Sequence, residues 1–176
     1  MAGVGVKPQQ QAESHKYMAK GQTDFSFGYK SMWVLAPERD GAHNWEGVGL
    51  QTALASLGAL RALAARTDAP ARADRIHVTG HSRGGHGALM VGLSQPDRCM
   101  SVSSLSGWYK REYYGDANPL FVADAQLSHL EPGLRKIYEA TISEHDGALL
   151  ASNLAGVAVL LRVGARAARV AWILSR

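Results

Sequence analysis

The residues best suited to chemistry form a glycine-flanked serine, Gly80-His81-Ser82-Arg83-Gly84, within the stretch "RIHVTGHSRGGHGAL". A strand-like apolar run precedes this G-x-S-x-G pattern, and small residues typical of a closely packed helix follow it. A serine on a sharp strand-to-helix turn presents its hydroxyl to solvent, and glycines beside it let the helix approach the strand. The pattern therefore predicts that Ser82 is a nucleophile for acyl transfer.

The start of the following helix supplies a second part of this chemistry. Backbone N–H groups in the first turn of a helix have no partner within the helix, and they point toward its N-terminal end. The N–H of Arg83 is therefore predicted to stabilise the oxyanion that forms when Ser82 attacks a carbonyl carbon. The alternative is a glycine-rich turn with a purely architectural role in another α/β fold.

A serine hydroxyl is a weak nucleophile until a histidine accepts its proton and a carboxylate orients that histidine. Downstream of the turn and outside its helix, the sequence offers two histidines, His129 and His145. The stronger candidate for a substitute base is His145, between Glu144 and Asp146. Adjacent helical residues point about 100° apart, so neither carboxylate would orient this ring well. The alternative is that "SEHDG" is a solvated helix end.

An alternation of strands and helices surrounds the serine turn and must position it. Short apolar runs bounded by turn residues predict strands, and apolar residues at three- and four-residue steps predict helices. Such alternation with short connections is typical of a parallel sheet covered by helices. In chain order we predict a strand over 31–38, a helix over 45–66 capped by Asn44, a strand over 75–80, a helix over 84–95, a strand over 100–107, one or two helices within 129–154 and a strand over 156–164.

The stretch "DRIHVTGHSRGGHGAL", followed by "QPDR" and a serine-rich strand, resembles the α/β-hydrolase family, nearest its prolyl oligopeptidase-like branch of peptidases and esterases. "MWVLAPERDGAHNW" is similar to the strand and loop before the serine, and "NLAGVAVLLRVGA" to the strand that leads to the catalytic acid. The resemblance spans residues 31–165. It implies an incomplete α/β-hydrolase fold, a mostly parallel sheet with helices on both faces. It also implies a serine hydrolase, with His81 and His86 at positions that shape its pocket. Tyr109 follows the strand that ends at Gly107, so its position predicts a pocket residue at the carboxyl end of the sheet; the alternative is half-buried packing.

The residues after the last predicted strand lack the remainder of a catalytic triad. In the family that this chain resembles, the order is serine, acid, histidine. The acid is expected just after Gly164, but "ARAARVAWILSR" contains no Asp, Glu or His. No "HGGG"-like stretch before residue 31 supplies a second oxyanion donor. We therefore expect a chain truncated at both ends and impaired in catalysis. The alternative is a non-catalytic module whose exposed sheet edge allows self-association.

The composition is that of an ordinary folded domain, with 46% hydrophobic and 19% charged residues among 176 and a net charge of +4. We expect a flexible lead-in over 1–24, the partial catalytic domain over 25–165 and an Arg-rich tail over 166–176. The expected partner is a peptide or ester substrate. We expect no cofactor, no metal, no nucleic acid and no membrane, because no matching motif or uninterrupted apolar run is present. The single cysteine, Cys99, and the lack of a signal-peptide core favour a cytoplasmic location.

Overall fold

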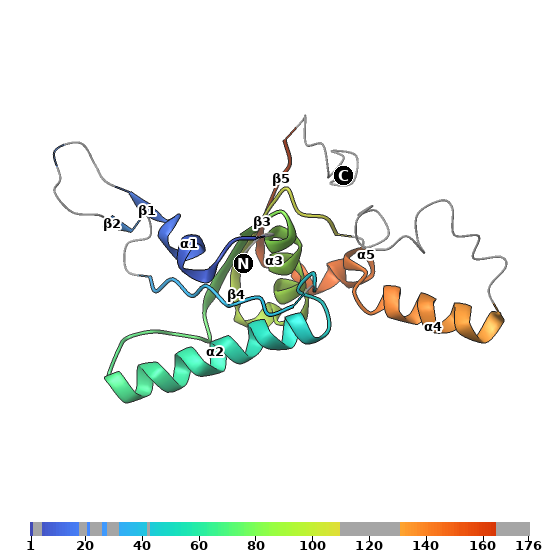
Figure 1. Cartoon of the computed structure of the whole chain (residues 1–176), viewed down its shortest axis with the longest axis horizontal. Coiled ribbons are helices and arrows are strands. Elements are labelled where there is room, and N and C mark those ends of the chain that lie inside the picture. The colour runs from blue at the N-terminus through green and yellow to red at the C-terminus, as the bar shows by residue number, and fades with distance from the viewer. Residues whose placement is uncertain are drawn as a thin grey trace.

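The computed structural model describes residues 1, 5–17, 21, 26–27, 32–41, 43–109 and 131–164. At its centre lies a parallel sheet in the order β3-β4-β5, made of β3 (Ile76–His81), β4 (Cys99–Leu105) and β5 (Ala158–Arg162) (Figure 1). Parallel neighbours need a crossover connection, and helix α3 (Arg83–Ser94) provides it between β3 and β4. The predicted α/β class, with a parallel sheet and helices, is confirmed.

The other elements follow the periodicity of the sequence closely. The helices predicted over 45–66 and 84–95 are present, as are the three strands predicted from residue 75 onward. The long helix begins after Gly47, so Asn44 is not its N-cap. The remaining elements are α1 (Pro8–Glu13), β1 (Lys16–Tyr17) paired antiparallel with β2 (Ser26–Phe27), α2 (Val48–Thr67), η1 (Pro96–Arg98), α4 (Pro132–Ser143), α5 (Gly147–Leu150) and η4 (Ala151–Leu154).

The core lies between α3 and the central strand β4. Every residue of α3 from Gly84 to Leu93 is buried, and Val102 of β4 is fully buried beneath it. A Cβ atom on Gly92 would lie only 2.5 Å from the Val102 side chain. The small residues of α3 therefore let its backbone approach the sheet closely, which fixes the helix over the strand that it follows.

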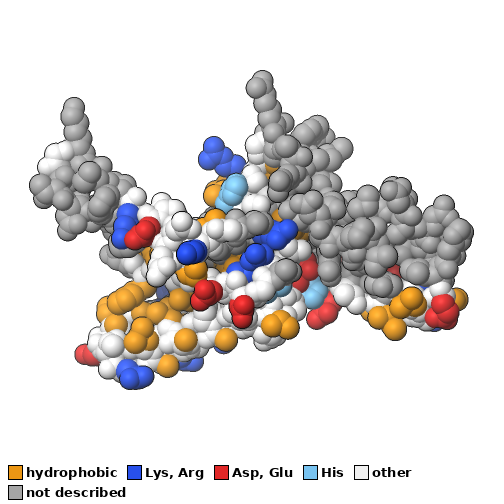
Figure 2. All heavy atoms as spheres, viewed as in Figure 1, with side chains coloured by type: hydrophobic (Ala, Val, Ile, Leu, Met, Phe, Trp, Pro, Cys, Tyr) orange, Lys and Arg blue, Asp and Glu red, His pale blue; other side chains and the backbone are white. Residues whose placement is uncertain are grey.

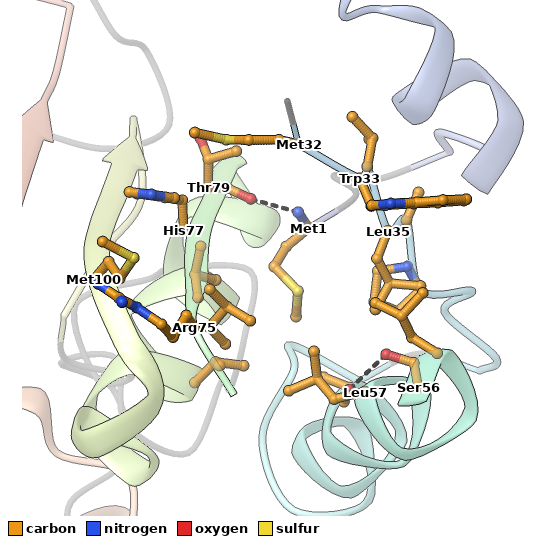
Figure 3. Close-up of a pocket in the computed structure, with 18 of the residues that line it drawn as sticks. Met1, Met32, Trp33, Leu35, Ser56, Leu57, Arg75, His77, Thr79 and Met100 are labelled. Carbon is orange, nitrogen blue, oxygen red and sulfur yellow. Dashed lines mark hydrogen bonds between the residues drawn. The ribbon is translucent and has the colours of Figure 1, made fainter. Parts of the chain in front are cut away.

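The strand predicted over 31–38 is not formed. Residues 32–40 have no strand pairing, and Met32 and Trp33 are about half exposed, at 48% and 57%. A cavity of about 630 Å³ separates this segment from the outer edge of β3 (Figure 3). Met1 lies in the cavity, where its terminal amine donates a hydrogen bond to the carbonyl of Thr79, and burial lowers the pKa of that amine to about 6. A strand requires a neighbour for its backbone groups, and across this cavity β3 cannot serve as one.

Helix α2 is long and apolar enough to cross a membrane by length and composition, although we expected no such segment; 22% of that stretch is buried. Its Ala53 belongs to the core cluster, whereas Val48 and Leu63 are exposed. Figure 2 shows hydrophobic side chains gathered along this helix. Length and composition alone do not assign α2 to a bilayer, because one of its faces packs on the core.

Cys99, the first residue of β4, gives a test of this packing. Burial raises the pKa of its thiol to about 11, whereas an unfolded cysteine ionises near pH 8.5. Only the thiolate reacts, so iodoacetamide at pH 8 should alkylate the folded chain on the order of 100-fold more slowly than the urea-unfolded chain. Mass spectrometry measures both rates. Because the folded thiol keeps its proton longer, stability should also fall as the pH rises from about 8.5 to 11; equal alkylation rates would contradict the burial.

Candidate active site

Ser82 occupies a strained turn between the end of β3 and the first residue of α3. Its backbone has φ 57° and ψ −123°, a region that side-chain-bearing residues rarely adopt. Its N–H donates to the carbonyl of Leu105 at 2.8 Å, and its own carbonyl accepts the N–H groups of Gly85 at 2.9 Å and His86 at 3.1 Å. The strand, serine and helix predicted from the glycine-flanked pattern therefore stand in the order that a nucleophile turn requires.

The glycines around Ser82 are required by contact between backbones. A Cβ atom on Gly80 would lie 2.1 Å from the carbonyl oxygen of Gly84. One on Gly85 would lie 2.9 Å from the carbonyl oxygen of Leu105 and 3.0 Å from Gly107. These neighbours are main-chain atoms, so they cannot rotate away as a flexible side chain would.

Two alanine substitutions measure this constraint. Gly80→Ala should destabilise the chain by about 2–3 kcal/mol, because the new methyl group overpacks against the backbone. Gly58→Ala is the matched control, since Gly58 lies inside α2 with nothing within 4 Å of the added carbon. It should stabilise the chain by about 0.5–1 kcal/mol. Urea unfolding of both variants checks the difference, and effects of the same sign and size would refute the contact argument.

The structure places the other predicted site residues at the same end of the sheet. Arg83 is the first residue of α3, so its N–H belongs to the turn where oxyanion donors are expected. His81 is exposed at the end of β3. The carbonyl of Tyr109 accepts the N–H of Gly147 at 3.0 Å, and Tyr109 lines a largely apolar cavity of about 350 Å³. The roles of Arg83, His81 and Tyr109 toward a substrate stay predictions.

His145 lies in a buried position, so the expectation of a solvated helix end is wrong for this residue and for Asp146, although Ser143 and Glu144 are exposed. His145 and Asp146 are each only 7% exposed. The Nε2 atom of His145 accepts the N–H of Gly47 at 2.9 Å, and a carboxylate oxygen of Asp146 accepts the N–H of Ala148 at 2.8 Å, capping α5. The hydrogen bond to Gly47 joins His145 to the loop before α2, a tertiary contact that local polarity could not indicate.

The hydrogen bond to Gly47 bears directly on His145 as a base. A neutral imidazole has a single nitrogen lone pair. Here that lone pair, on Nε2, is directed at the Gly47 N–H. Within the part of the chain that the structure describes, no hydrogen bond joins the His145 ring to Ser82. The substitute-base role stays a prediction, and it requires His145 to release Gly47 first.

His86 and Glu46 form a buried pair that the sequence did not reveal. His86 is fully buried on α3, its Nε2 lies 2.8 Å from a carboxylate oxygen of Glu46, and its Nδ1 lies 2.8 Å from the carbonyl of Trp108. The imidazole also stacks on the Trp108 ring, with centroids 4.7 Å apart. Forty positions separate His86 from Glu46, so no local spacing could signal the pair. Since both nitrogens have partners, this ring has no lone pair for the Ser82 proton.

A comparison with family models assigns the chain to a group of known proteins. The model of a family described as "Putative esterase" matches residues 12–175, which is most of the sequence. The chain belongs to this esterase family. The family is part of the α/β-hydrolase superfamily, so the superfamily expected from the serine turn is confirmed. No curated protein matches the chain. The matched range of this esterase-family chain includes β3, Ser82 and α3, and membership supports a hydrolase function on ester substrates.

Proposed function

We propose that the chain is a serine esterase with Ser82 as its nucleophile. The observation that carries this proposal is the strained Ser82 turn between β3 and α3, within the range matched by the esterase family. The Ser82 oxygen bonds to the acyl carbon of an ester, and the alcohol leaves with the proton that the serine loses. Water then cleaves the acyl–serine bond, releases the acid and restores the hydroxyl. The Arg83 N–H stabilises the oxyanion in both steps.

Proton transfer from Ser82 limits the rate that we expect. Neither His86 nor His145 offers a nitrogen lone pair to the serine in the arrangement described above. Serine hydrolase sites that lack a triad member still accelerate the reaction on the order of 10³-fold over water, through oxyanion stabilisation and binding. With the described residues in this arrangement we therefore expect a slow enzyme, and faster turnover if His145 exchanges its Gly47 hydrogen bond for one with Ser82.

The nature of the leaving group favours esters over peptides. The resemblance to the prolyl oligopeptidase-like branch would also allow a peptidase. An amine leaves only after it has been protonated, so peptide cleavage depends on a histidine that first takes and then returns the proton. An activated ester releases its alcohol as an alkoxide or phenolate, a more stable anion than that of an amine, and this anion takes up the serine proton after it leaves. Since no histidine among the described residues is hydrogen-bonded to Ser82, ester cleavage is the reaction that this site supports better.

Labelling with a fluorophosphonate probe tests the nucleophile. We expect slow labelling of the unmodified chain and none of Ser82→Ala. Ser101→Ala is the matched control, because the Ser101 hydroxyl has a histidine partner, His77 Nδ1, at 2.7 Å. It should label as the unmodified chain does. Gel fluorescence measures the labelling, and a folded chain that never labels would favour the non-catalytic binding module.

A histidine variant tests the base. If His145 accepts the Ser82 proton, His145→Ala should reduce both probe labelling and p-nitrophenyl acetate hydrolysis by about 10²-fold or more. If the ring only holds the loop before α2, the variant should melt at a lower temperature and label at an unchanged rate below that temperature. Labelling rate and thermal unfolding, measured on the same preparations, separate the two outcomes.

A further inference from the structure

Three hydrogen bonds connect the Ser82 turn, the first turn of α3 and the segment from Leu105 to Trp108 at the end of β4. The carbonyl of Leu105 accepts the Ser82 N–H at 2.8 Å, and the carbonyl of Trp108 lies 2.8 Å from His86 Nδ1. The His86 N–H in turn donates to the Ser82 carbonyl at 3.1 Å. Both ends of the segment 105–108 are thus tied to the first turn of α3. A shift of the His86 ring therefore acts on the segment that packs against the serine turn.

The orientation of the His86 ring depends on its second nitrogen. The Trp108 carbonyl can only accept, so Nδ1 must donate to it. Nε2 then needs a partner of its own, because a buried polar atom without one is costly. Glu46, whose side chain is only 9% exposed, provides that partner at 2.8 Å. The carboxylate and the Trp108 carbonyl together fix the rotation of the imidazole.

Contacts on both sides hold Glu46 in turn. Trp45, fully buried, packs so closely on α3 that a Cβ atom on Gly87 would lie 2.5 Å from its ring. On the other side, the Gly47 N–H donates to His145 Nε2. The backbone around Glu46 is therefore held in place independently of the carboxylate. A carboxylate on a fixed backbone can in turn hold the His86 ring in one orientation.

We propose that Glu46 is a positioning residue for the Ser82 turn, acting through His86 and the Trp108 carbonyl. The proposal deepens the proposed function and rests on it for the chemistry of Ser82. The positioning itself is a property of the backbone, and it can be measured whether or not the serine reacts.

Amide hydrogen exchange of two Glu46 variants tests the proposal. In Glu46→Gln the new amide donates to Nε2 while Nδ1 continues to donate to Trp108, so exchange should be unchanged. In Glu46→Leu the ring loses its partner. The amides of Ser82, Gly85 and His86 should then exchange about 10- to 100-fold faster, the factor expected for a lost hydrogen bond to a charged group. The fully buried amide of Val102 in the central strand is the internal reference and should change little.

A matched pair of control variants shows whether changes in exchange are specific to Glu46. Glu139 forms an exposed ion pair with Arg135 at 2.7 Å, so Glu139→Leu and Glu139→Gln repeat the chemical changes away from the turn. Neither should alter exchange at the turn. Equal acceleration at Val102 and at the turn in Glu46→Leu, no acceleration at all, or identical effects of Gln and Leu would overturn the proposal.

If Glu46→Leu does not fold, Glu46→Asp, which withdraws the carboxylate by one methylene, should accelerate exchange at the same three amides; no acceleration there would also overturn the proposal. Fluorophosphonate labelling of the same samples reports on the proposed function separately. Absent labelling with the expected exchange pattern refutes the esterase and leaves the positioning role standing. Labelling of Ser82 without the expected exchange pattern supports the esterase and refutes the positioning role of Glu46.

Discussion

Direct contact between main chains at the end of β3 is the constraint on which the site depends. The first turn of α3 approaches Gly80 and the loop after β4 so closely that a single β-carbon would collide with a carbonyl group. That approach brings the Ser82 N–H to Leu105 and the Ser82 carbonyl to two amides of α3. These hydrogen bonds hold the serine at a positive φ that it would otherwise leave. The strain is thus maintained by the packing of the helix on the sheet.

Two buried histidines near the turn, His86 and His145, are engaged in hydrogen bonds that hold the surrounding structure. A base needs an unengaged lone pair directed at the serine hydroxyl. The described structure uses the ring nitrogens of His86 to hold two loops together and Nε2 of His145 to hold the start of α2. Both rings therefore contribute to the architecture around the turn. Esterase-family membership supports a hydrolase function, and the geometry of Ser82 is consistent with acyl transfer. Among the described residues, these two rings are engaged elsewhere than at the serine.

Local signals in the sequence predicted most of the elements. Apolar periodicity located α2 and α3, short apolar runs located β3, β4 and β5, and glycine spacing located the Ser82 turn. The errors arose where distant segments decide the outcome. The run from Met32 onward has the composition of a strand but forms no strand pairing among the described residues. Within the polar "SEHDG", His145 and Asp146 are buried, and His145 accepts a hydrogen bond from a loop about 100 residues earlier. Forty positions separate Glu46 from His86, so no local spacing in the sequence predicts that they form a pair.

The cavity between β3 and the segment from Met32 to Pro37 has a practical consequence for ligand discovery. It is the larger of the two cavities described, at about 630 Å³, and Ser82 is not among the described residues that line it. A compound that binds in this cavity, beside the Thr79 carbonyl, would therefore leave the serine accessible. Such a compound would be detected in a binding screen but not in a screen by competition with a serine-directed probe.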